Sequence, residues 1–146
     1  MWQAITNFFL SLRTYRDLSP DLRVRRRVNA MLKRSRPDVS FDHWAVFFAA
    51  ATDRPPSLRL LRFVYQQLAD YSGLIVGCIR PSDRLIEDLH LPLICWFDWP
   101  NQLCADFHTT FQVDISEDFD ESLLQTVGDL VGFLQKKLQS MDSLAS

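Results

Sequence analysis

Residue types of this 146-residue chain that often supply nucleophiles, general bases or metal ligands include three histidines and three cysteines. They are His43, His90, His108, Cys78, Cys95 and Cys104. The histidines do not share metal-ligand spacing with one another or with the cysteines, so no metal site is predicted. Cys95 and His90 could form a thiolate–imidazole pair, but no neighbouring residue is predicted to orient the imidazole. We therefore interpret Cys95 as a packing residue, and an enzyme built on it is the least favoured of three alternatives.

The sequence motifs of common enzyme classes are absent. The chain has no Gly-x-Ser-x-Gly nucleophile elbow, no Walker loop and no dinucleotide-binding fingerprint. The acidic pairs at residues 87–88 and 117–118 have the character of helix-end and surface charges. An odd number of cysteines in apolar surroundings predicts buried thiols in a reducing compartment. We therefore expect a non-enzymatic, cytoplasmic protein that holds no cofactor and no metal.

Charge is distributed unevenly along the chain. The formal net charge is −2, but the residues through Arg36 carry +7 and the remainder carries −9. Six of the basic residues form a predicted basic patch on one helix: Arg23, Arg25, Arg26, Arg27, Lys33 and Arg34. A patch of this kind is typical either of a solvated helix face or of contact with nucleic acid or an anionic membrane surface.

Apolar residues recur at helical spacing through much of the chain, which predicts an all-α fold. The low glycine count of four disfavours a turn-rich β architecture. A first amphipathic helix is marked by Trp2, Ile5, Phe9 and Leu12. Further helices are predicted at residues 20–36, 41–51, 57–71 and 126–138, and a central helix is marked by Trp96, Trp99, Leu103 and Phe107. Residues 74–79 are interpreted as a buried connector, because no second strand is predicted to pair with them.

Several helix ends carry recognisable capping signals. The predicted N-caps are Ser19 (with Pro20 as the first helical residue), Ser40, Ser57 and Thr126, and Gly73 is a predicted C-terminal end. Lys136 and Lys137 are expected near the negative end of the last helix. Pro100 falls inside the predicted central helix and indicates either a kink or a second helix start.

Helical phase and apolar character also predict which side chains are buried. The expected core residues in the less regular parts of the chain are Trp44, Phe47, Phe48, Leu85, Leu89, Trp96, Trp99, Leu103 and Phe107. Asp83, Glu87 and Asp88 are expected to stay in water. The sequence Arg54-Pro55-Pro56 is a firm break. It predicts a boundary between an N-terminal helical extension, residues 1–54, and a main helical domain, residues 55–146.

From about residue 57 to residue 138 the order and spacing of short motifs resemble the acyl carrier protein family. The matching residues are Asp83, Leu85, Ile86, Glu87, Asp88, Leu89, Asp98, Leu103, Asp106, Phe107, Phe111, Ile115, Ser116, Thr126, Val127 and Leu130. The resemblance implies a small antiparallel bundle of three main helices and one short helix. Its helices would be residues 57–71, 93–111, 119–123 and 126–138.

The chain departs from this family at the residue that carries the prosthetic group. In the family, Glu-Asp-Leu is followed by Gly-x-Asp-Ser-Leu, whose serine bears 4′-phosphopantetheine. Here the corresponding residues are His90-Leu91-Pro92-Leu93-Ile94, so the serine position is occupied by Leu93. Leucine has no oxygen to form a phosphodiester, and carrier activity of the usual kind is therefore not expected.

The resemblance implies a protein-interaction module that lacks the prosthetic group. Partner enzymes of the family meet the second helix and the loop before it, which places partner-binding residues at Asp88, Leu93, Phe97 and Asp98. The alternative is a peripheral membrane or nucleic-acid-binding adaptor that uses the basic helix. The two differ in salt dependence, because polyanion binding falls steeply with salt and an apolar contact does not.

Overall fold

The computed structural model describes residues 20–145, with their side chains through residue 141, and in this part of the chain the fold is an all-α bundle. Residues 20–145 form six α-helices and two short 3₁₀ helices, with one isolated β-bridge and no strand. The α-helices are α3 (Leu22–Ser35), α4 (Phe41–Ala50), α5 (Leu58–Ser72), α6 (Leu91–Ile94), α7 (Trp99–Phe111) and α8 (Val127–Ala145). The 3₁₀ helices are η1 (Val76–Cys78) and η2 (Glu121–Leu123). The predicted helix marked by Trp2, Ile5, Phe9 and Leu12, and the predicted cap Ser19, lie outside the described residues.

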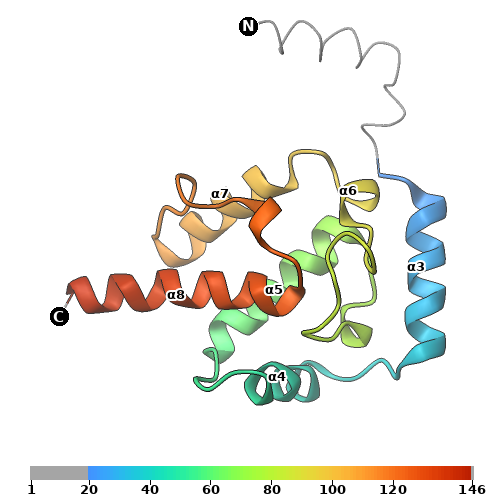
Figure 1. Cartoon of the computed structure of the whole chain (residues 1–146), viewed down its shortest axis with the longest axis horizontal. Coiled ribbons are helices and arrows are strands. Elements are labelled where there is room, and N and C mark those ends of the chain that lie inside the picture. Colours follow the sequence, from blue (N-terminus) through green and yellow to red (C-terminus); the bar gives the residue numbers. More distant parts are fainter. Residues whose placement is uncertain (1–19, 146) are drawn as a thin grey trace, which may run out of the picture.

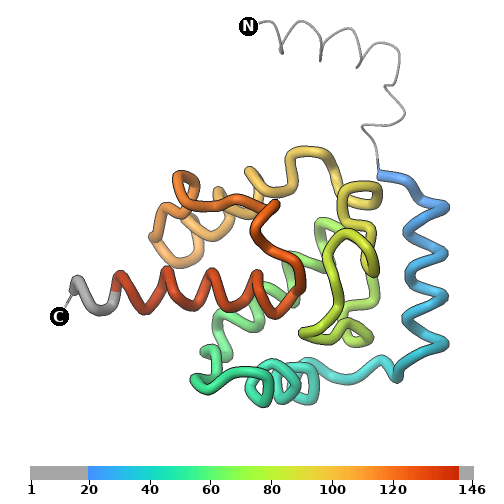
Figure 2. Tube along the Cα trace, viewed as in Figure 1, coloured from blue at the N-terminus to red at the C-terminus, as the bar shows by residue number. Residues whose placement is uncertain are grey.

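Helix α5 lies across the middle of the molecule and packs against α4 and α8 (Figure 1). Helix α3 stands at one end and packs against α6. The chain between η1 and α6 passes between α3 and the beginning of α8 (Figure 2). It is tied to α8 by backbone hydrogen bonds from Leu85 N to Gln125 O and from Val127 N to Asp83 O. This loop therefore joins the beginning of α8 to the segment that leads into α6.

The helix ends follow the capping signals with one exception. Ser40 accepts a hydrogen bond from the backbone of α4, and Ser57 caps α5 in the same way. Gly73 ends α5 in the left-handed conformation, with φ of 70°, as glycine readily does. At α3, however, Asp21 is the N-cap and accepts from two backbone N–H groups, so Pro20 is not the first helical residue. An ionised carboxylate is a strong acceptor for these otherwise unpaired N–H groups.

The central helix predicted at residues 93–111 is two helices. α6 ends at Ile94 and α7 begins at Trp99, with Pro100 in its first turn, so Pro100 marks a second start and not a kink. The first turn tolerates proline because its N–H would have no partner there. The prediction that Trp96 shares the buried stripe is therefore wrong: it lies between the helices and is exposed. Trp99, Leu103 and Phe107 lie on the buried face, as predicted.

Helix α8 also differs from its prediction, at its far end. Its start is a reciprocal cap in which Thr126 Oγ1 accepts from Asp129 N, while the Asp129 carboxylate accepts from Thr126 N. The helix continues to Ala145, so Lys136 and Lys137 lie within it and not near its negative end. The short helix predicted at residues 119–123 is reduced to η2.

The buried apolar residues form one cluster to which both sides of the predicted boundary contribute. Helices α3 and α4 supply Val28, Leu32, Trp44 and Phe48, and the remaining helices supply the rest. Phe47 was expected in this core, but it is 39% exposed and lies beneath the guanidinium of Arg80, 4.3 Å from the ring centre. The inward face of α4 runs through Trp44, Ala45 and Phe48, which leaves Phe47 at its edge. No helix among the described residues has both the length and the apolar character needed to cross a membrane.

Candidate interaction surface around α6

Helix α6 is a four-residue helix held firmly on the body of the protein. Leu91 and Ile94 are buried, so their neighbours Pro92 and Leu93 face outward. Leu91 N donates to Leu85 O, and Leu93 O accepts from the Asp21 backbone at 2.9 Å. These bonds attach α6 to the preceding loop on one side and to the beginning of α3 on the other. The outward side chains of α6 are therefore presented by a supported backbone.

Large apolar side chains gather on and beside this helix without being covered. Ile86 is 56% exposed, Leu93 52%, Trp96 54% and Phe97 70%. Single exposed apolar residues are common, but four within residues 86–97 are a concentration of the kind found where another molecule binds. We call these four residues the α6 surface.

Two hollows flank α6. The first, the α3 hollow, has a volume of about 280 Å³ and is lined by Val24, Arg27, Val28, Met31, Arg34, His90 and Leu93. The second, the α7 hollow, has a volume of about 230 Å³ and is lined by Leu85, Ile86, Pro92, Phe97, Trp99, Pro100 and Glu121. Adjacent residues of α6 line different hollows, Pro92 the second and Leu93 the first. The helix is thus a ridge between two shallow, largely apolar depressions.

The structure places the predicted partner-binding residues in two different situations. Leu93, Phe97 and Asp98 are exposed on or just after α6, and their role in binding stays a prediction. Asp88 is instead engaged within its own loop, where its carboxylate accepts hydrogen bonds from the side chain and backbone of Arg84. These hydrogen bonds lower the pKa of Asp88. Ile86 and Trp96 were not among the predicted binding residues, although their apolar character beside charged or turn residues was visible in the sequence.

The predicted basic patch on α3 is exposed except at one residue. Arg23, Arg26, Arg27, Lys33 and Arg34 are exposed. Arg25 is half-buried: its Nη2 donates to Ile94 O at 3.2 Å, and its Nε is buried without a hydrogen-bond partner. A Cβ atom on Gly73 would lie 2.8 Å from Arg25 Nε, which shows how closely this side chain packs. Arg25 faces the body of the protein and does not belong to the exposed patch.

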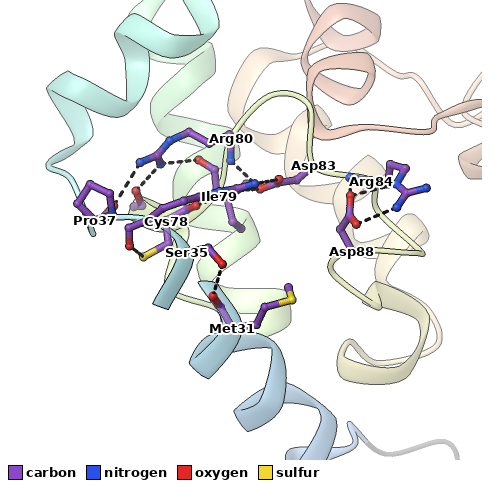
Figure 3. A network of polar contacts seen from close by, with 11 residues as sticks. Met31, Ser35, Pro37, Cys78, Ile79, Arg80, Asp83, Arg84 and Asp88 are labelled. Atoms are coloured by element: carbon purple, nitrogen blue, oxygen red, sulfur yellow. Dashed lines mark hydrogen bonds and ion pairs between the residues drawn. The ribbon is translucent and has the colours of Figure 1, made fainter. Parts of the chain in front are cut away.

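Asp83 is the clearest departure from the sequence-based expectation. It was predicted to lie in water but is 3% exposed. Its carboxylate accepts two hydrogen bonds from the Arg36 guanidinium and one from the backbone N of Arg80 at 2.8 Å. Figure 3 shows Asp83 between Arg80 and the separate Arg84–Asp88 pair. The hydrogen bonds to Asp83 raise the pKa of Arg36. This partly buried ion pair anchors the loop that carries Ile86.

The chemistry of the possible nucleophile does not favour catalysis. Cys95 is buried in the core, and this burial raises the pKa of its thiol to about 12. A thiol with that pKa is protonated at neutral pH, and the protonated form is a poor nucleophile. His90 lines the α3 hollow and has left-handed backbone geometry, with φ of 54°. Within residues 20–141 no group of three or more His, Cys, Asp or Glu side chains is placed to hold a metal ion.

Comparisons with protein-family models, with curated proteins and with solved structures find no match to this chain. The structure itself defines the described residues as an all-α bundle with an exposed apolar surface around α6.

Proposed function

We propose that this chain is a non-enzymatic interaction module that binds another protein through the α6 surface. The observation that carries the proposal is the exposure of Ile86, Leu93, Trp96 and Phe97 within one short stretch. Aromatic side chains are frequent anchors of protein interfaces, since they bury a large area at little cost in side-chain entropy. Leaving several of them in water has no benefit for the isolated fold.

The attachment of α6 to the body of the protein supports the proposal. Binding is weakened when a flexible segment must be ordered, and it is favoured when the contact residues are already held in place. The buried side chains of Leu91 and Ile94, together with the backbone bonds to the 81–89 loop and to α3, supply this support. The α6 surface therefore requires little reorganisation before a partner can bind.

In this proposal the protein is an acyl-carrier-like module that lacks the attachment serine. Leu93 is the third residue of the four-residue helix α6, which follows the Glu87-Asp88-Leu89 motif, and its side chain is exposed. An attachment residue would need that exposure, but leucine supplies an apolar contact where the family has a phosphodiester. The same position thus supports binding to a partner and not the carriage of a prosthetic group.

The test is affinity capture from the native host with identification of the bound protein. Leu93→Ser should reduce capture of that protein, because it removes an apolar contact from the α6 surface. Leu58→Ser is a matched control, since Leu58 is also exposed, at 66%, but lies at the beginning of α5 and lines neither hollow. Equal capture by wild type and Leu93→Ser, or equal losses in both variants, would contradict the proposal.

A second candidate is polyanion binding through α3. It is favoured by the five exposed cations of this helix, for which the described part of the chain provides no acidic partner. Binding to nucleic acid or to an anionic membrane surface would then fall steeply as salt rises. Capture through the α6 surface should change little over the same range, because its contacts are mainly apolar.

A further inference from the structure

The α3 hollow combines an apolar floor with a basic rim. Val24, Val28, Met31 and Leu93 supply the apolar lining, and the polar lining consists of Arg27, Arg34 and His90. Its volume of about 280 Å³ is just below the roughly 300–1,000 Å³ typical of small-molecule pockets. A depression of this size suits one or two apolar side chains of a larger partner, with polar groups of that partner at the rim.

The two arginines of the rim stand on the same side of α3. They are seven residues apart, which in an α-helix is close to two full turns and about 10 Å along the axis. No acidic side chain in residues 20–141 forms an ion pair with either of them. Helix α3 itself contains no acidic residue. The rim is therefore a pair of cations, suitably spaced for two carboxylates on a partner segment.

The other side of the α6 ridge has the opposite charge. Glu121 lines the α7 hollow, and Glu87 and Asp98 are exposed next to its lining residues Ile86 and Phe97. An anionic bilayer or a nucleic-acid backbone is negatively charged throughout, so it would be repelled by these carboxylates when it reached α6. A protein segment can place its acids over α3 alone. Charge complementarity therefore favours a peptide over a uniform polyanion.

We infer that the partner contributes an acidic amphipathic segment that docks between α3 and α6. This inference rests on the proposed function. One or two of its large apolar side chains fill the α3 hollow and contact Met31 and Leu93. Its carboxylates lie beside the guanidinium groups of Arg27 and Arg34. This is the arrangement in which an amphipathic peptide places its apolar face in a groove and its charged groups on the rim.

The experiment selects peptides from a random display library against the full-length chain and measures the binding of synthetic copies by fluorescence polarisation. We expect the selected peptides to contain Asp or Glu near Leu, Phe or Trp. The double variant Arg27→Glu/Arg34→Glu should weaken their binding about tenfold or more, because it replaces two attractive contacts with repulsive ones. Met31→Ser should also weaken it, by loss of apolar lining.

The matched control is the double variant Arg26→Glu/Lys33→Glu. It makes the same change in net charge on the same helix, but helical phase places both residues on the side of α3 away from the hollow. The loss there should be about threefold or less, since a helix diameter of about 10 Å is comparable to the Debye length at moderate salt. Equal losses in the two double variants, or selected peptides without acidic residues, overturn the inference.

Two further comparisons distinguish failure of this inference from failure of the proposed function. Selected peptides that are sensitive to Phe97→Ser but not to Arg27→Glu/Arg34→Glu overturn the acidic-segment inference and leave the α6 surface as a binding site. Peptides whose binding is changed neither by Phe97→Ser nor by Arg27→Glu/Arg34→Glu overturn the acidic-segment inference and the proposed function together. Vesicles containing phosphatidylserine and a short DNA duplex are tested in parallel. If these bind through Arg27 and Arg34 and the acidic peptides do not, the occupant is a polyanion and the inference is overturned.

Discussion

Arg36 and Asp83 form a bidentate ion pair that joins the end of α3 to the loop before α6. Nη1 of Arg36 lies 2.5 Å from Oδ2 of Asp83, and Nη2 lies 2.6 Å from Oδ1. The Asp83 side chain is almost completely buried, whereas the Arg36 side chain is 29% exposed. Arg36 Nη1 also donates to Cys78 O at 3.0 Å. A carboxylate in this environment depends on its partner, because burial of an unpaired charge is costly.

We expect Asp83→Asn to lower the free energy of unfolding by about 2–4 kcal/mol, measured by urea denaturation. The substitution removes the negative charge that compensates Arg36 and replaces one acceptor oxygen with a donor group. The control is Asp88→Asn, which breaks the more exposed pair with Arg84 and should cost about 0–1 kcal/mol. Similar losses in the two variants would show that burial of Asp83 does not govern the strength of its pair.

Helix ends were predictable where the capping group lies close in the chain. Ser40, Ser57 and Gly73 act on backbone groups within four residues, so the sequence contains both partners of each interaction. The reciprocal cap of Thr126 and Asp129 belongs to the same kind. The all-α class was predictable for a related reason, since helical periodicity records which face of each helix is buried.

The surroundings of Asp83 and Arg25 were not predictable because their partners are far away in the chain. Arg36 is 47 residues from Asp83, and Ile94 is 69 residues from Arg25. No local sequence pattern predicts such a contact, and an acidic residue in a loop is usually exposed. The prediction that Trp96 is buried was wrong for a different reason. Its spacing from Trp99 suits a continuous helix, but the chain leaves helical geometry at Cys95. Of the candidate site, the exposure of Leu93, Phe97 and Asp98 was predicted, and their role in binding stays a prediction. Neither of the two hollows beside α6 was predicted.

Truncation tests the predicted boundary near Pro55. A chain beginning at Pro55 loses Val28, Leu32, Trp44 and Phe48, which belong to the same buried cluster as the remaining helices. We expect this fragment to show no cooperative thermal or urea transition, since buried leucine, valine and aromatic side chains each contribute roughly 1.5–3 kcal/mol. A chain beginning at Pro20 keeps all of these residues and should unfold cooperatively. A cooperative transition in the shorter fragment would support a domain that folds independently.

Tyr71 provides a test at alkaline pH. Burial, together with the hydrogen bond that its hydroxyl donates to Asp106, raises the pKa of Tyr71 above its ordinary value. The folded state therefore favours the neutral phenol. The resulting stabilisation is fully present below the unfolded pKa of about 10 and is lost as pH rises from there toward the folded pKa.

Tyr71→Phe should remove this dependence. At neutral pH it should lower the free energy of unfolding by about 1–2 kcal/mol through loss of the hydrogen bond to a charged acceptor. Between about pH 10 and pH 12, wild type should lose stability more steeply than the variant, as measured by urea denaturation at each pH. Parallel pH profiles for the two proteins would show that the Tyr71 hydroxyl is not held in its protonated form by folding.

The identity of Leu93 leads to an expectation about covalent modification. In the protein from its host, we expect the proteolytic peptide that contains Leu93 to have its unmodified mass, with no phosphopantetheine attached. Incubation with coenzyme A and a broad-specificity phosphopantetheinyl transferase should leave that mass unchanged, while a serine-bearing carrier protein in the same reaction is modified. A mass gain of one prosthetic group would refute the serine-less interpretation.

Substitutions of Phe97 and Leu103 distinguish an effect on partner binding from an effect on stability. Leu103 is buried on the inner face of α7, so Leu103→Ala should lower the free energy of unfolding by about 2–5 kcal/mol. Phe97 is the most exposed aromatic residue of the α6 surface, so Phe97→Ala should change stability by no more than about 0.5 kcal/mol. The same change should weaken capture of the partner, because the α7 hollow loses part of its lining. If Phe97→Ala unfolds the protein as readily as Leu103→Ala, then Phe97 is a core residue in solution. The α6 surface would then lose its most exposed residue, and the proposed mode of binding would have to be abandoned.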